Sequence, residues 1–132
     1  QSHRDRYYET LGLISKEKKW NPWIEFFLSG VIEHCSENER LLWNMTKLYE
    51  ESKEKFTSAT NSSFAINILD FIFAQPVFSI PGIHKKYSNM SKQVIAQLMA
   101  KLCHAGQIEK VFPGRGRQPS VYKFPSLLQL LA

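Results

Sequence analysis

The side chains best suited to chemistry in this sequence are basic and amide groups in its C-terminal half. Lysine and arginine bind phosphate oxygens, and glutamine can form two hydrogen bonds with the edge of an adenine base. Acting together, such groups predict contact with double-stranded DNA. The candidate DNA-binding residues are Lys85, Lys86, Ser91, Lys92, Gln93, Gln97, Lys101, Arg115 and Arg117.

The distribution of charge along the chain favours the same partner. Residues 76–132 carry eight Lys or Arg against Glu109 alone, a net charge of +7. Residues 1–75 carry nine Lys or Arg against eleven Asp or Glu, a net charge of −2. Because phosphate contacts supply most non-specific nucleic-acid affinity, the concentrated positive charge indicates a polyanion surface. A merely solvated basic surface is the alternative.

The elements that would position these residues form a winged helix-turn-helix domain over residues 63–132. Apolar spacing predicts three helices, one over 64–75, one from Ser79 or Pro81 to about 87, and one that follows the Ser91 cap and ends at Gly106, with residues 77–79 extended before the second. Ser63 and Ser91 are expected to cap the first and third helices, and Gly106 to end the third. Two strands, 108–112 and 121–124, then form a β-hairpin, and 125–131 forms a short apolar helix. Inward-facing Ile68, Leu69, Ile72, Phe73, Ile83, Tyr87, Val94, Ile95, Leu98 and Leu102 are predicted to form the core.

In this arrangement the third helix carries the groove-facing residues. With its apolar residues turned inward, Lys92, Gln93 and Gln97 project outward near its N-terminus, the end that reaches base edges. Lys85, Lys86 and Lys101 are placed for phosphates. The loop 113–120 contains Gly-Arg-Gly-Arg and no acidic residue, which suits it to a DNA backbone or minor groove. A winged helix that serves protein–protein contact is the competing interpretation.

The sequence predicts a separate helical segment over residues 1–60. Apolar residues at helical spacing predict a short helix over 4–14. Asn21 and Pro22 mark the start of a long helix, with Asn21 as its cap and Pro22 at the first position. It would run for roughly 35 residues, about 50 Å, unless it breaks in two at the polar run 36–40. The polar stretch 57–63 is the expected linker. The fold class is therefore mainly α with a small β-hairpin.

Composition and motifs exclude several other functions. Cys35 and Cys103 lack metal-ligand or redox spacing and are expected to be reduced, buried thiols, and no metal or cofactor is predicted. The longest apolar stretch, 64–80, is too short and too interrupted to span a membrane. Without a secretion signal, the chain is expected in the cytoplasm. Because Gln1 stands where a complete chain usually has methionine, a fragment of a longer protein is expected.

Several aromatic residues give the chain a resemblance to a known family. Arg6-Tyr7-Tyr8 with Leu11, and the run Trp20-Asn21-Pro22-Trp23 continuing to Val31, are similar to the segment that follows the active-site loop of Fic-family proteins. Pro76-Val77-Phe78 and the stretch 117–125 resemble the winged helix that many Fic proteins append. The family commonly transfers AMP from ATP to protein hydroxyls. The resemblance implies an AMPylating nucleotidyltransferase as parent, with its catalytic domain upstream.

The family's catalytic signature, His-Pro-Phe-x-(Asp/Glu)-Gly-Asn-Gly-Arg, does not occur here. None of His3, His34, His84 and His104 is followed by Pro-Phe. The chain alone is therefore expected to be no enzyme and to bind no ATP. We expect a DNA-binding or regulatory C-terminal module of a Fic-family protein. The alternative is a non-catalytic fragment of a protein adenylyltransferase whose winged helix serves protein interaction or dimerisation. The aromatic residues before residue 60 also predict an apolar patch that meets the upstream catalytic domain in the parent and drives homodimer formation in isolation.

Overall fold

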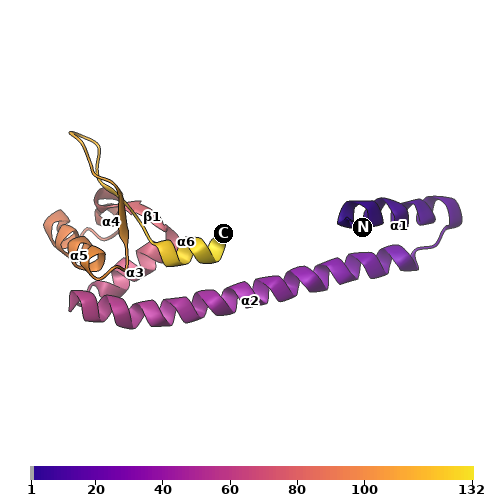
Figure 1. The fold of residues 1–132 in the computed structure, drawn as a ribbon, viewed down its shortest axis with the longest axis horizontal. Coiled ribbons are helices and arrows are strands. Elements are labelled where there is room, and N and C mark those ends of the chain that lie inside the picture. The colour runs from indigo at the N-terminus through magenta and orange to yellow at the C-terminus, as the bar shows by residue number, and fades with distance from the viewer. Residues whose placement is uncertain (1) are drawn as a thin grey trace. The chain divides into compact units, whose positions relative to one another are not determined.

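The computed structural model describes residues 2–132 and is mainly helical, with a small three-stranded antiparallel sheet. Figure 1 shows the elements in chain order along the ribbon. Their bounds are α1 (His3–Glu17), α2 (Asn21–Thr60), α3 (Ala65–Ala74), β1 (Val77–Ser79), α4 (Ile80–Lys86), α5 (Lys92–His104), β2 (Glu109–Phe112), β3 (Val121–Lys123) and α6 (Pro125–Leu131).

The chain forms two compact units, one up to Leu42 and one from Trp43 to Ala132. The division falls within α2, so this helix contributes its first half to one unit and its second half to the other. The linker expected over residues 57–63 begins inside α2, which stays helical to Thr60, and the division between the units lies earlier, after Leu42.

In the first unit, α1 begins and ends with local backbone caps. Ser2 Oγ accepts a hydrogen bond from the Asp5 amide (3.3 Å), and the Asp5 carboxylate accepts one from the Ser2 amide (3.4 Å). This reciprocal pair satisfies two amides that a helix start leaves unpaired. Lys18 ends the helix in a left-handed conformation, with φ 53°. The helix is thus longer at both ends than the predicted 4–14.

Helix α2 is a single helix of 40 residues. The polar run 36–40, where the sequence predicts a possible break, stays helical, and every side chain in it is exposed. Asn21 is the first helical residue and not the cap, because the Ile24 amide bonds the Trp20 carbonyl at 3.0 Å. After Pro22 in the first turn, no further proline occurs in α2, which explains its continuity.

The core of the second unit lies where α3, α4 and α5 meet the sheet and the end of α2. Ile68, Leu69 and Ile72 are buried as predicted, whereas Phe73 is half-buried. Ser63 does not cap α3: the helix follows Phe64, whose amide bonds Ser62 Oγ at 3.2 Å. The other large, completely covered side chains are Phe56, Ile83, Met90, Ile95, Met99, Leu102, Ile108, Phe124 and Leu127.

The predicted hairpin is part of a larger sheet. Strand β3 lies between β1 and β2, with Tyr122 opposite Phe78 on one side and opposite Lys110 on the other. The Phe124 amide bonds the Pro76 carbonyl at 2.9 Å and closes the β1 side. The extended residues 77–79 therefore supply a third strand, which corrects the expectation of a two-stranded hairpin.

The length and apolar content of the helices decide whether one of them could cross a membrane. None of those in residues 2–132 combines the length and the apolar content that crossing a bilayer requires.

Candidate nucleic-acid interface

Ser91 fixes the start of α5. Its backbone is extended, with φ −68° and ψ 151°, and its Oγ accepts a hydrogen bond from the Val94 amide at 3.2 Å. This is the capping role predicted from the sequence. The cap sets where the first turn begins. It therefore determines which side chains of that turn point into solvent.

The first turns of α5 have a covered face and an open one. Ile95, Leu98 and Met99 are buried against the core, and Val94 is half-buried. On the opposite side Lys92, Gln93, Ala96 and Gln97 are all exposed, as their spacing predicted. One cation and two amides with free donor and acceptor capacity therefore share this face.

A short turn joins α4 to α5, and a histidine holds it. His84 Nδ1 lies 2.7 Å from the carbonyl oxygen of Met90. Because a carbonyl only accepts, Nδ1 carries the proton in this bond. Met90 is buried, and its amide bonds the Tyr87 carbonyl at 3.1 Å. His84 thus ties the last turn of α4 to the residue before the α5 cap, a role that its position next to two lysines did not suggest.

The two lysines of α4 are exposed but differ in their surroundings. The Lys86 ammonium lies 5.5 Å from the ring centroid of Tyr87 and 5.8 Å from that of Phe71. Both distances suit a cation–π contact. Lys85 is exposed on the same turn. The pair forms a basic end to α4, next to the turn that leads into α5.

Lys101 does not join the open face of α5. Its ammonium donates a hydrogen bond to the Thr60 carbonyl at 3.1 Å. Thr60 is the buried last residue of α2, and its own hydroxyl donates to the Phe56 carbonyl at 2.7 Å. Lys101 therefore satisfies a carbonyl that the end of a helix leaves without an intrahelical partner. The structure gives it this structural contact, which the sequence analysis missed.

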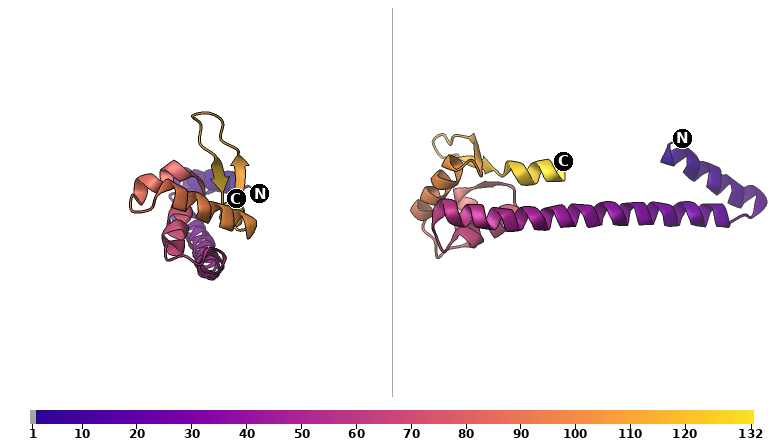
Figure 2. Two further views of the ribbon diagram at one scale, coloured as in Figure 1. Left: turned by 90° about the vertical axis from the view of Figure 1, so that its left-hand side faces the viewer. Right: turned by 60° about the horizontal axis from the view of Figure 1, so that its bottom comes forward.

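The loop between β2 and β3 carries Arg115 and Arg117, and both are exposed. Figure 2 shows this loop projecting beyond the helices of its unit. A tight turn closes it, since the Gln118 amide bonds the Arg115 carbonyl at 3.0 Å and Gly116 has φ +57°. At Gly114 a Cβ atom would lie 2.6 Å from the Gln118 carbonyl oxygen, so only glycine fits there.

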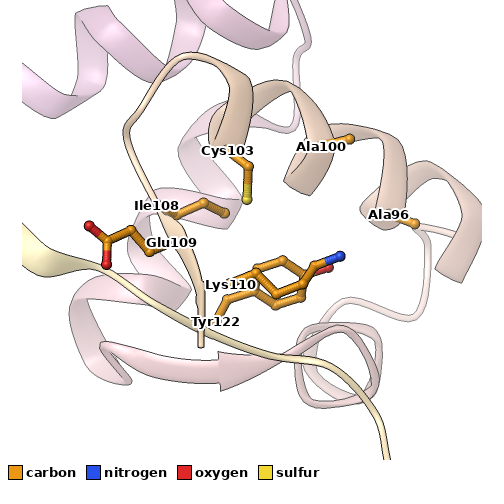
Figure 3. Close-up of a pocket in the computed structure, with 7 residues that line it drawn as sticks. All are labelled: Ala96, Ala100, Cys103, Ile108, Glu109, Lys110 and Tyr122. Atoms are coloured by element: carbon orange, nitrogen blue, oxygen red, sulfur yellow. The ribbon is translucent and has the colours of Figure 1, made fainter. Parts of the chain in front are cut away.

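An open groove of about 680 Å³ separates α5 from the sheet. Small residues, Ala96 and Ala100, line the helix side. On the sheet side the Lys110 chain extends along the Tyr122 ring, with its ammonium 5.6 Å from the ring centroid (Figure 3). The groove is lined by Ala96, Ala100, Cys103, Ile108, Glu109, Lys110 and Tyr122.

A thiol and a carboxylate also line this groove. The thiol is that of Cys103, which is half-buried and not buried as expected, while Cys35 is exposed. Partial burial raises the pKa of the Cys103 thiol above its ordinary value, although the nearby Lys110 opposes the shift. A neutral thiol is a poor nucleophile, so the groove offers no activated sulfur. Glu109 pairs with Lys123 at 2.9 Å, which leaves Lys110 as the cation within the groove lining. Lys110 was not among the predicted site residues. A strand of four residues is too short for its sequence to indicate which face each side chain occupies.

The predicted site residues therefore fall into three groups. The open face of α5 and the projecting loop carry Lys92, Gln93, Gln97, Arg115 and Arg117, while α4 presents Lys85 and Lys86. Ser91 and Lys101 have structural contacts. Within residues 2–132, three or more His, Cys, Asp or Glu side chains nowhere gather as a metal site would require. In a comparison with known protein families, no family model matches the chain.

Proposed function

We propose that residues 63–132 form a winged helix-turn-helix that binds double-stranded DNA, and that it is the regulatory C-terminal module of a Fic-family protein. The observation that carries the DNA proposal is the exposed, acid-free face of α5, with Lys92, Gln93 and Gln97 in its first two turns. A helix presented in this way fits the major groove. The order of three helices followed by two antiparallel strands supports the winged-helix assignment.

The projecting loop supports the same proposal. Its arginines are exposed and can lie along a phosphate backbone or in a minor groove next to the helix. Small residues on α5 leave room for a nucleic-acid strand between the helix and the sheet, and Lys110 provides a cation there. Neutralised phosphates release counterions, so binding should weaken steeply with salt.

The Fic assignment rests on the aromatic segments in the first unit. The two segments that resemble the family lie against each other, with the rings of Tyr7 and Phe26 6.4 Å apart. In this proposal α1 and the first half of α2 follow an upstream catalytic domain, which performs the AMP transfer. This chain itself supplies no catalytic residue and uses no cofactor.

The test is a duplex titration by fluorescence anisotropy across a salt series. Arg115→Ala with Arg117→Ala should weaken binding to all sequences and lower the salt slope by about two units, roughly 0.9 for each lost phosphate contact. Gln93→Ala should instead relax the preference for one base pair, at a cost of about 1–3 kcal/mol of discrimination.

A matched control removes the same charge elsewhere. Arg4 and Arg6 are exposed residues of α1, so Arg4→Ala with Arg6→Ala lowers the net charge equally without touching the proposed interface. Its DNA affinity should stay close to that of the unmodified chain. Equal losses in both double variants, or no binding even at low salt, would refute the proposal and favour a protein-interaction role for the domain.

A further inference from the structure

Apolar side chains recur along α2, and they are buried to different extents in the two units. In its second half, Met45 and Tyr49 pack against the core and Phe56 is completely buried. In the first unit, Ile24, Leu28, Val31 and Cys35 form an apolar stripe. Ile24 and Val31 are seven residues apart, and so are Leu28 and Cys35. A seven-residue repeat keeps side chains close to one face of a helix.

In the first half of α2 the stripe is exposed. The solvent-accessible fractions are 42% for Ile24, 53% for Phe27, 51% for Leu28 and 42% for Val31. We call these residues, together with exposed Cys35, the exposed seam. Apolar side chains of α2 thus pack against the core from Met45 onward but are open to solvent between residues 24 and 35.

A glycine beside the seam leaves a hollow. A Cβ atom at Gly30 would meet no atom within 4 Å, so packing within the described chain does not require a glycine there. Glycine inside a helix lowers its stability. Its presence is explained if a side chain of another molecule fills the space. The hollow is lined by Phe26, Phe27, Gly30, Val31, His34, Cys35 and Asn38.

We propose that the exposed seam binds the exposed seam of a second copy of this chain. With Trp20, which is 57% exposed at the start of the helix, its large residues offer roughly 500 Å² of apolar area per copy, taking about half of the full area of each. A standard interface buries about 800 Å² per partner, a little over half of it apolar. The apolar area available on each copy therefore matches the apolar part of a standard interface.

A two-fold arrangement fits this surface. Each copy offers the half-exposed ring of Phe27, which stacks on Trp23 with the ring centroids 5.5 Å apart, and a hollow at Gly30. In a two-fold arrangement the Phe27 of one copy can enter the hollow of the other, and the reverse contact forms at the same time. Residues 24–42 carry Glu25, Glu33, Glu37 and Glu39 against Arg40 alone. Two copies therefore repel each other electrostatically, and salt should strengthen the dimer.

This salt dependence separates the dimer from the proposed DNA binding, which salt should weaken. Sedimentation equilibrium of the full chain, from micromolar to near-millimolar concentration at low and high salt, should show a monomer–dimer equilibrium that tightens with salt. Phe27→Glu should weaken the dimer about 30-fold or more, as expected for an aromatic residue at the centre of an interface.

Two further variants distinguish a loss of the dimer contact from a loss of folding. Ile32→Glu places the same charge on a side chain that is 65% exposed and lies one turn after Leu28, at the edge of the seam, so it should weaken the dimer only a few-fold. Gly30→Ala should raise the helical content of the full chain while weakening the dimer, because alanine favours the helix and its methyl group fills the hollow. Circular dichroism confirms the helical content of each variant.

A strictly monomeric chain, equal losses from Phe27→Glu and Ile32→Glu, or a tighter Gly30→Ala dimer would each overturn the proposal. A monomer that binds duplex DNA would overturn the dimer alone. A dimer that fails to bind DNA would overturn only the DNA proposal.

Discussion

Replacing Lys101 by methionine should destabilise the second unit, whereas the same replacement at Lys92 should not. Both lysines lie exposed on α5, but only the Lys101 ammonium bonds the Thr60 carbonyl at the end of α2. Methionine keeps the length and helix propensity of the side chain and removes the charge and the donor. The pair of variants therefore isolates the contact.

The magnitude follows from the two contributions that the ammonium makes. A hydrogen bond from a charged donor contributes about 1.5–3 kcal/mol when buried, and less here because the lysine is largely exposed. A cation at a helix C-terminus adds about 0.3–1 kcal/mol. We expect Lys101→Met to lower the free energy of unfolding by about 1–2 kcal/mol. Lys92→Met should leave it unchanged or raise it by about 0.3 kcal/mol, because Lys92 lies at the positive N-terminal end of α5.

Urea unfolding followed by circular dichroism measures both values, with an unchanged slope against urea as the check that only stability has changed. The DNA titration gives the complementary result. Lys92→Met should lower the salt slope by roughly 0.9, and Lys101→Met should leave it unchanged. If Lys101→Met is as stable as the unmodified chain and lowers the salt slope as Lys92→Met does, then Lys101 contacts phosphate and the reasoning is wrong.

Two further changes test other contacts. Tyr49 donates a hydrogen bond to Asp70 at 2.6 Å, and this bond raises the pKa of Tyr49 to about 12. Tyr49→Phe should lower the free energy of unfolding by about 0.5–1.5 kcal/mol below pH 10. Since the folded pKa is the higher one, this difference should shrink as the pH rises from 10 to about 12, and urea unfolding across that range measures it; a constant difference would contradict the assignment. Gly106 has φ +69°, so Gly106→Ala should cost about 1 kcal/mol by thermal unfolding, and an unchanged midpoint would contradict the strain argument.

Local sequence patterns predicted the parts of the fold that depend on neighbours within one helix. The spacing of Ile95, Leu98 and Leu102 defined the buried face of α5, and the exposure of Gln93 and Gln97 follows from it. A cap such as Ser91 acts over three residues, so its role was also readable. The open face of the candidate interface could therefore be predicted without a structure.

Contacts between residues far apart in the sequence could not be predicted in this way. The acceptor of Lys101 lies 41 residues earlier in the chain, so nothing near the lysine distinguished it from a phosphate-binding residue. Strand β1 has three residues, too few for an alternating pattern to indicate a partner strand. His84 bonds Met90 across a turn whose geometry the sequence left open.

The position of β3 in the sheet also fixes the order in which the second unit can fold during synthesis. Strand β3 completes the sheet between β1 and β2, and Phe124 and Leu127, which follow it, complete the core. Helix α3 buries Ile68 and Ile72 in that core, yet it leaves the ribosome about 50 residues earlier, which is roughly 3–10 s at ordinary rates of translation. A ten-residue helix is only marginally stable in isolation, so α3 cannot complete its packing until the residues after β3 have emerged. The apolar residues of this segment therefore stay without their complete core until β3 and the residues after it have been made.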